Sequence, residues 1–345
     1  PRHNAGVKVR VLPSNREFRA SGDEPVLAAA LRGHFNLPHS CKSGHCASCR
    51  ARIVSGQVSY PGPRPLGLTA EEESAGFALL CQARATSDLV IEARELRRVT
   101  DIEIKTLPCR IESRELLAPD VLRLTLRLPA VENFPFQAGQ YLDVLPGGGR
   151  RRSFSIASPP HDAARLELHV RQVPGGGFTS ELFAHEGPGA LLRIEGPIGQ
   201  FVYVDATTPV IFVAGGTGFA PVKSMLREAL ERGSARDIWF YWGARTPPDL
   251  YEESLVRRWM EVHPRFHFTG VLSDTPADAP GATRFARGWV HEAVLAQHPD
   301  LSGYDVYAAG PPAMIEAIRA RFPAHGLAEG RLRFDSFDYA PPVQA

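Results

Sequence analysis

The sequence has no apolar run long enough to cross a membrane. Its longest apolar stretches, such as "VIFVAG" at 210–215, are far shorter than the roughly 20 residues that a spanning helix requires. The N-terminal residues also lack the apolar core of a signal peptide. We therefore expect a cytoplasmic protein with no membrane span.

An excess of charge of one sign is missing as well. The chain holds 39 Lys and Arg residues against 38 Asp and Glu residues, a formal net charge of +1, so neither nucleic acid nor an anionic membrane is expected as a partner. No Ser–His–Asp triad and no pair of catalytic carboxylates is recognisable.

Cysteine is scarce, with five residues in 345. The odd number and the large size of the chain disfavour a disulfide framework. Three of the five lie within nine residues, because Cys41, Cys46 and Cys49 are spaced C-x4-C-x2-C, and the next is Cys81. Cys109 lies outside this pattern and is expected to be a buried structural thiol.

Two kinds of metal site compete for the four patterned cysteines. A C-x2-C pair forms half of a zinc knuckle, but zinc ribbons join two such pairs and only one is present here. The C-x4-C-x2-C…C arrangement is the ligand pattern of plant-type [2Fe–2S] clusters. His39 and His45 suggest a Rieske centre, which four well-spaced cysteines make unnecessary. We therefore predict a [2Fe–2S] cluster, with zinc as the alternative, held by Cys41, Cys46, Cys49 and Cys81.

The pattern of predicted strands and helices changes twice along the chain, which predicts three domains. Residues 1–97 contain short strands around one helical segment, and their order resembles the β-grasp fold of a plant-type [2Fe–2S] ferredoxin. Residues 106–203 read as short alternating strands with regular turns, which indicates an antiparallel β-barrel or sandwich. Residues 208–340 alternate strands with helices, which indicates a doubly wound parallel sheet. The predicted fold class is thus multidomain, α+β and α/β.

Glycine-containing turns follow several predicted strands of the last domain. "VAGGTGFAP" and "YAAGPP" place glycines between a buried strand and a helix start, where a pyrophosphate can approach backbone N–H groups. A third strand end, "YWGARTPPDLY", is expected near the adenosine half of a dinucleotide. The residues predicted to bind the dinucleotide are Gly215, Gly216, Thr217, Gly218, Arg245, Asp249, Gly310 and Pro311.

Two further segments lie in the middle domain, "RSFS" at 152–155 and "GFTS" at 177–180. With these motifs, essentially the whole chain resembles the ferredoxin–NADP reductase superfamily, in the subgroup with an N-terminal plant-type ferredoxin domain. It is similar to the reductase components of phenol hydroxylase and related oxygenases, and to CDP-6-deoxy-3,4-glucoseen reductases. The resemblance implies the order [2Fe–2S], FAD, NAD, with residues 106–203 as the FAD-binding β-barrel.

The resemblance also implies roles for single residues. Arg152 would bind the flavin pyrophosphate, Phe154 would stack on the flavin, and Ser155 would lie near flavin N5 as a catalytic residue. The C-terminal tail is expected to bring Phe337 to the flavin face where nicotinamide enters, with packing of a terminal strand on its own core as the alternative. The implied flavin-binding residues are Arg152, Ser153, Phe154, Ser155, His169, Val170, Arg171, Gly177, Thr179 and Ser180.

Two residues depart from the family pattern. Phe154 stands where the family usually has Tyr, so a hydroxyl group is lost while stacking survives. Ala309 stands where the family has the Cys of C-G-P, so the thiol expected beside the nicotinamide is absent. Neither departure implies an inactive protein.

The predicted function is that of an NAD(P)H-dependent oxidoreductase. It would pass electrons from NADH via FAD and the [2Fe–2S] cluster singly to a partner protein, such as an oxygenase, hydroxylase or sugar-nucleotide dehydrase component. The acceptor is expected to dock on the ferredoxin domain, whose residues 1–97 hold 13 Lys and Arg against 9 Asp and Glu. The alternatives are a non-enzymatic redox sensor and a free-standing flavin reductase with no dedicated protein acceptor.

NADH is expected to be preferred over NADPH. Asp249 follows the second strand of the last domain, where an acidic group can accept ribose hydroxyls and repel a 2′-phosphate. Arg245 and Arg227 act in the opposite direction.

The cysteine pattern gives the first prediction. The purified protein should be brown and contain about two irons and two labile sulfides per chain. Cys46→Ser or Cys81→Ser should lose both, because each removes one ligand. Metal and sulfide analysis with a visible spectrum checks this, and a result of one zinc with no iron would contradict it.

Overall fold

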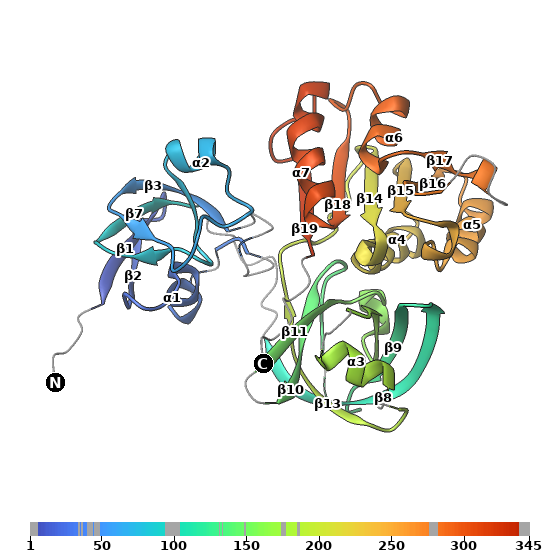
Figure 1. The fold of residues 1–345 in the computed structure, drawn as a ribbon, viewed down its shortest axis with the longest axis horizontal. Coiled ribbons are helices and arrows are strands. Elements are labelled where there is room, and N and C mark those ends of the chain that lie inside the picture. The colour runs from blue at the N-terminus through green and yellow to red at the C-terminus, as the bar shows by residue number, and fades with distance from the viewer. Residues whose placement is uncertain are drawn as a thin grey trace. The chain divides into compact units, whose positions relative to one another are not determined.

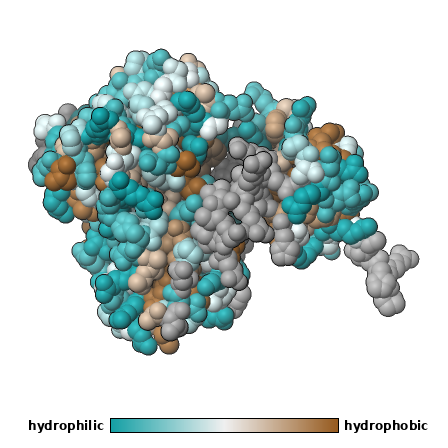
Figure 2. All heavy atoms as spheres, turned by 180° about the vertical axis from the view of Figure 1, so that it is seen from behind, coloured by the Kyte–Doolittle hydropathy of each residue, from teal (hydrophilic) through white to brown (hydrophobic). Residues whose placement is uncertain are grey.

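The computed structural model describes residues 6–33, 35, 37–39, 44, 49–93, 104–130, 132, 134–147, 150–173, 177–184, 187–275 and 282–337. The chain divides into two compact units, Pro1–Asp101 and Ile102–Ala345, which are described separately (Figure 1). Within these ranges, every helix is too short or too polar to span a lipid bilayer. On the face seen in Figure 2, hydrophilic residues predominate and hydrophobic ones form small groups among them.

The first unit is built on a mixed five-stranded sheet in the order β2-β1-β7-β3-β5. β1 pairs parallel with β7 and antiparallel with β2, and β3 pairs antiparallel with β5 and β7. Val9 and Val11 of β1 are fully buried while Arg10 between them is exposed, which is the alternation of a strand with one buried face. The elements are β1 (Val7–Leu12), β2 (Arg16–Ala20), α1 (Val26–Arg32), β3 (Arg50–Ser55), β4 (Val58–Ser59), α2 (Ala70–Ser74), β5 (Phe77–Leu79), β6 (Arg84–Ala85) and β7 (Leu89–Glu92).

The second unit begins with an antiparallel six-stranded sheet in the order β11-β10-β13-β8-β9-β12. An isolated antiparallel bridge between Ile156 and Leu168 links the end of β11 to β12, so the two outer strands of this order meet. The enclosed side chains form one apolar core. The elements are β8 (Lys105–Ala118), β9 (Val121–Arg127), β10 (Tyr141–Gly147), β11 (Arg150–Ser155), β12 (Arg165–Arg171), α3 (Gly177–Ala184) and β13 (Leu191–Ile198).

A parallel six-stranded sheet in the order β17-β16-β15-β14-β18-β19 completes the second unit. Its strands are β14 (Val210–Gly215), β15 (Ile238–Ala244), β16 (Phe266–Leu272), β17 (Ala286–Arg287), β18 (Asp305–Gly310) and β19 (Leu332–Ser336). The helices that connect them are α4 (Phe219–Glu231), α5 (Glu253–Val262), α6 (Val290–Gln297) and α7 (Pro312–Arg321).

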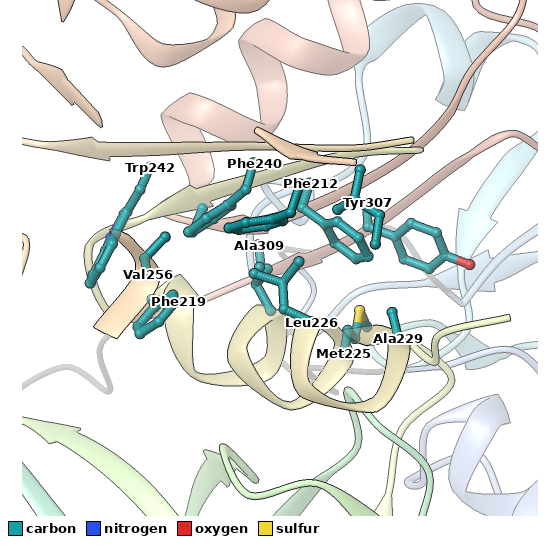
Figure 3. Packing of buried hydrophobic residues seen from close by; sticks show 14 of the residues in the cluster. Phe212, Phe219, Met225, Leu226, Ala229, Phe240, Trp242, Val256, Tyr307 and Ala309 are labelled. Carbon is teal, nitrogen blue, oxygen red and sulfur yellow. The ribbon is translucent and has the colours of Figure 1, made fainter. Parts of the chain in front are cut away.

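Both faces of the parallel sheet are covered, as the sequence predicts for a doubly wound fold. Alternate residues of β14 point to opposite faces: Phe212 packs in the core under α4 and α5, while Ile211 and Val213 pack in the core under α6 and α7. Figure 3 shows Phe219, Met225, Leu226 and Ala229 of α4 close beneath the aromatic residues of the sheet. The predicted β-grasp, barrel and doubly wound fold classes are confirmed.

The antiparallel and parallel sheets are joined by a shared core rather than by a linker alone. Ala138 and Phe201, from loops of the antiparallel part, belong to the apolar cluster under α4. Gly139 has φ +102°, and a Cβ there would lie 2.1 Å from the Phe201 carbonyl oxygen and 2.2 Å from Met225 Cε. Only glycine allows the chain to approach α4 so closely at this position. Residues 102–345 therefore behave as one body.

Candidate functional site

Two turns meet at the carboxyl edge of the parallel sheet. β14 ends at Gly215 and passes through the short turn Gly216–Gly218 into α4, while the neighbouring β18 ends at Gly310 and passes through Pro311 into α7. The helices after these two strands cover opposite faces of the sheet. Adjacent parallel strands whose connections diverge in this way leave a crevice between them, which is where doubly wound sheets bind nucleotides.

Glycine is required where these turns touch. A Cβ on Gly218 would lie 2.0 Å from the carbonyl oxygen of Ala309, so any side chain there would push the turn away from β18. Gly216 has φ +53°, which is left-handed backbone that glycine adopts without strain. The turn predicted from "AGGTG" therefore has a physical reason for its glycines.

The crevice is a cavity of about 570 Å³, large enough for part of a dinucleotide. Of the residues predicted to bind the dinucleotide, five line this cavity: Gly215, Gly216, Arg245, Asp249 and Pro311. Gly218 is buried and contributes to the shape of the turn through its close approach to β18. The structure thus brings three separate loops together around one space.

Arg171 reaches this cavity from the antiparallel part of the unit. It ends β12, its side chain is 14% exposed, and its Nη1 lies 3.4 Å from Asp120 Oδ2. Its Nε and Nη2 are buried without a hydrogen-bond partner among the described residues. Nη2 lies 3.6 Å from the Cβ position of Gly216, so the guanidinium faces the glycine turn. Buried, unsatisfied donors beside a helix start fit an anionic group such as a pyrophosphate.

Asp249, which is predicted to contact a ribose, lines the cavity and also holds its own turn. Asp249 Oδ2 accepts hydrogen bonds from Thr246 N and Thr246 Oγ1, each at 2.9 Å, so one carboxylate oxygen already holds the turn. The contact of Asp249 with a ribose stays a prediction, and it would use the other carboxylate oxygen, Oδ1. Trp289, just before α6, also lines the cavity although it is 61% exposed. Sequence reasoning missed this indole, whose face is suited to stack on a purine.

The "RSFS" segment lies on β11 with alternating environments. Ser153 Oγ donates a hydrogen bond to Asp143 Oδ1 on β10 at 2.6 Å, and Arg152 Nη1 donates to the Arg151 carbonyl at 2.8 Å. The Phe154 ring lies 6.3 Å from the ring of Phe178, centroid to centroid. Phe178 belongs to the first turn of α3, so the two predicted flavin motifs are neighbours in space.

This neighbourhood fits a flavin dinucleotide. Arg152 provides a cation, and α3 begins at Gly177 within the predicted G-x-x-S turn. Thr179 Oγ1 accepts a hydrogen bond from Val173 N at 3.3 Å, which ties this helix start to the end of the β12 segment. The roles of Ser155 and Ser180 stay predictions, since Ser155 is buried at the end of β11 and Ser180 is half-buried.

His169 and Val170 cannot offer their side chains to a flavin. Val170 is fully buried in the core of the antiparallel sheet. The His169 ring is buried between Glu167 Oε1, 2.6 Å from Nε2, and the Tyr251 hydroxyl, 3.0 Å from Nδ1. Burial lowers the pKa of His169, which keeps the imidazole neutral. Any contact of these two residues with a flavin therefore involves the main chain alone.

Phe337 lies close to the second glycine turn. Its backbone N–H donates to the Gly310 carbonyl at 3.0 Å, and its ring packs on the core beneath α4. This position, next to the nucleotide turns, is compatible with a place at the flavin face. It is also compatible with the alternative that the terminal strand packs on its own core. Its role at the flavin stays a prediction, and residues 338–345 lie outside the described range.

Two of the four predicted cluster ligands are described, and they lie side by side. Cys49 and Cys81 are both buried, and Cys81 N–H points at Cys49 Sγ over 3.4 Å. Backbone N–H groups directed at sulfur are typical of iron–sulfur sites, so this pair fits the cluster. Cys41 and Cys46 lie outside the described residues. Cys109 is buried, as predicted, and burial raises the pKa of its thiol to about 12.

The placement of Arg171 gives the second prediction. Arg171→Met should raise the dissociation constant for NADH about tenfold or more and leave the FAD content unchanged, because one charge-assisted contact contributes about 1.5–3 kcal/mol. Arg165→Met is the matched control, since Arg165 lies at the other end of β12 and pairs with Glu112 over 2.7 Å. Titration of both variants checks this. If Arg171→Met instead lost FAD and bound NADH like wild type, Arg171 would be a flavin-binding residue, as the family resemblance implies.

Known proteins match all three parts of the chain. Residues 9–86 match the 2Fe-2S iron-sulfur cluster binding domain, residues 108–203 the oxidoreductase FAD-binding domain, and residues 212–320 the oxidoreductase NAD-binding domain. Each match agrees with one of the three sites built above.

Several relatives align with this chain over nearly its whole length. The chain is 39% identical over 331 residues to CDP-6-deoxy-L-threo-D-glycero-4-hexulose-3-dehydrase reductase of Yersinia pestis, covering 96% of this chain and 98% of the relative. It is 35% identical over 339 residues to reductase component 1 of terephthalate 1,2-dioxygenase from Comamonas sp., covering 97% and 98%. The crystal structure of the Amycolatopsis cytochrome P450 reductase GcoB matches with a TM-score of 0.76 and 34% identity, covering 96% and 98%. The chain therefore belongs to the iron–sulfur flavoprotein reductases of the ferredoxin–NADP reductase superfamily, those with an N-terminal [2Fe–2S] domain followed by FAD- and NAD-binding domains.

Proposed function

We propose that this reductase draws electrons from NADH in pairs and delivers them singly, through its [2Fe–2S] domain, to a separate acceptor protein. The observation that carries the proposal is the reach of Arg171 from a strand of the flavin barrel into the nucleotide cavity. A side chain of one cofactor domain that lines the site of the other supports direct transfer between the two cofactors. The domain boundaries we propose are 1–97, 106–203 and 208–340.

The chain's own residues bind and orient the cofactors. A bound flavin accepts a hydride from nicotinamide and releases electrons one at a time, which a [2Fe–2S] cluster can accept. Arg152 and the start of α3 would hold the flavin pyrophosphate. The turn at 215–218 and Arg171 would hold the nucleotide pyrophosphate. Ser155 and Phe337 would flank the place where the two rings meet.

The acceptor is proposed to be the oxygenase, hydroxylase or dehydrase component of a two-protein system. One relative is named as a dehydrase reductase and another as the reductase component of a dioxygenase, and each matches this chain over nearly its whole length. The acceptor would dock on the ferredoxin domain near Cys49. A cytoplasmic location is proposed because a reducing compartment keeps cluster-ligating cysteines free of disulfides.

The third prediction concerns nucleotide choice. NADH should give a kcat/KM at least about tenfold above that for NADPH, because Asp249 at the cavity disfavours a 2′-phosphate. Asp249→Asn removes the negative charge but keeps a side-chain oxygen that can accept the Thr246 hydrogen bonds. It should therefore reduce the ratio of kcat/KM for NADH to that for NADPH without loss of stability. Steady-state kinetics with both nucleotides checks this. A wild-type preference for NADPH would reverse the assignment.

The fourth prediction tests the order of transfer. Cys49→Ser should lose the cluster yet still allow NADH to reduce FAD and ferricyanide, whereas reduction of cytochrome c should collapse. Ser155→Ala should show the opposite, with slow flavin reduction and a cluster that still accepts electrons from dithionite. Anaerobic stopped-flow spectra separate the two. If the protein without the cluster reduced cytochrome c at the full rate, electrons would leave from the flavin. That result would favour a free-standing flavin reductase.

No NADH-driven bleaching in the wild-type protein would instead favour a redox sensor. This outcome requires that iron, sulfide and FAD are all present at full occupancy, so that an unloaded site does not explain it. The same spectra supply that control.

A further inference from the structure

A group of buried charged side chains lies where the flavin barrel meets the nucleotide-binding sheet. Lys223 comes from α4, Glu252 from the residue before α5, and Glu167 from β12. Lys223 Nζ lies 2.7 Å from Glu167 Oε1, and 2.8 Å and 2.7 Å from the two carboxylate oxygens of Glu252. The side chains of Lys223 and Glu252 are 4% and 6% exposed, so the ammonium group is nearly sealed from water. One cation thus bridges a carboxylate from each part of the unit.

The surrounding residues add further ion pairs and hydrogen bonds. Arg123 of β9 makes a second ion pair with Glu252, so two cations balance the carboxylates of Glu167 and Glu252. Burial acts to raise the pKa of Glu167, but the hydrogen bond from His169 and the charge of Lys223 outweigh it, so its pKa is lowered. An ionised Glu167 can only accept, which makes His169 Nε2–H the donor to it. Nδ1 then accepts from the Tyr251 hydroxyl.

The cluster resembles a metal site, but its centre is filled. Glu167, His169 and Glu252 bring ligand atoms within 4.8 Å of one another, a donor set that divalent cations use. Lys223 Nζ contacts both carboxylates at hydrogen-bond distance and already supplies the positive charge. We therefore assign the position to the ammonium and not to a metal ion.

The cluster joins the elements that carry the two cofactor sites. α4 begins directly after Gly218 of the nucleotide turn, and Lys223 and Ser224 lie within its first six residues. Ser224 Oγ donates to the Ser158 carbonyl at 2.7 Å, and Ser158 lies three residues after Ser155 of the flavin motif. On the other side, β12 continues from Glu167 to Arg171, which lines the nucleotide cavity.

We propose that Lys223 is a positioning residue for hydride transfer: held between Glu167 and Glu252, it sets the nucleotide-binding sheet on the flavin barrel so that nicotinamide meets flavin. The inference rests on the function proposed above. Buried ion pairs add little net stability over apolar packing, but they tolerate little displacement because each charge needs its partners. Reacting atoms must come within about 3–3.5 Å, and a misplacement of about 1 Å lowers a rate about 100-fold.

The test is the limiting rate of flavin reduction by NADH in the full-length, cofactor-loaded protein. Lys223→Met keeps an unbranched side chain and removes the charge. We expect the rate at saturating NADH to fall about tenfold or more, with FAD content and the NADH dissociation constant close to wild type. Arg257→Met is the matched control, since Arg257 pairs with Glu253 within α5 and does not join the two parts.

A second variant keeps the test decisive if Lys223→Met folds poorly. Lys223→Met with Glu167→Gln removes one charge of each sign and leaves Glu252 paired with Arg123, so it should fold and bind FAD while still losing the limiting rate. A third, Lys223→Ala, leaves room for an exogenous amine. Methylammonium or ethylammonium should raise its limiting rate and leave wild type and Arg257→Met unchanged.

The wild-type control separates failure of the inference about Lys223 from failure of the proposed function. If wild type reduces its flavin and the FAD-loaded Lys223 variants do so at the rate of Arg257→Met, Lys223 has no positioning role and the inference is overturned. A variant that loses NADH affinity but keeps the limiting rate also overturns it. Failure of wild type itself would refute the proposed function instead.

Discussion

A hydride passes only between atoms in near contact, and the architecture of residues 102–345 follows from that constraint. The flavin barrel and the nucleotide-binding sheet form one compact unit. Ala138 and Phe201 of the barrel part complete the core beneath α4, and Gly139 lets the chain approach that helix at van der Waals distance. A single electron needs no such contact, and the [2Fe–2S] domain is accordingly a compact unit of its own.

The nucleotide site shows the same dependence on close backbone approach. Gly218 lies so near the Ala309 carbonyl that a side chain would separate β14 from β18. The two turns and Arg171 line one cavity, and the start of α4 together with the Arg171 cation suits an anionic dinucleotide. Ala309 itself is fully buried, so the residue in place of the family thiol faces the core and serves packing.

Much of this could be predicted from local sequence signals, and the rest depends on packing. Cysteine spacing, glycine turns and strand–helix alternation each act within a few residues, so they were sufficient to predict the three folds and the glycine turns at the edge of the parallel sheet. The direction of Arg171 could not be inferred in this way, because it depends on which neighbour faces the end of β12. Lys223, Glu167 and Glu252 are far apart in sequence and look like surface charges until the fold brings them together. Trp289 gave no signal, since it is exposed beside an ordinary helix start.

The buried charges at the joint are better understood as a geometric device than as a source of stability. Replacing a buried ion pair with apolar side chains of similar size is often neutral or stabilising, so stability alone does not explain Lys223. Apolar surfaces, however, can slide over one another with small losses of contact. An ammonium hydrogen-bonded to three carboxylate oxygens cannot shift without leaving a charge unpaired in a dry site. The ion pairs of Lys223 therefore restrict motion on the helix that begins at the nucleotide turn, where hydride transfer tolerates little displacement.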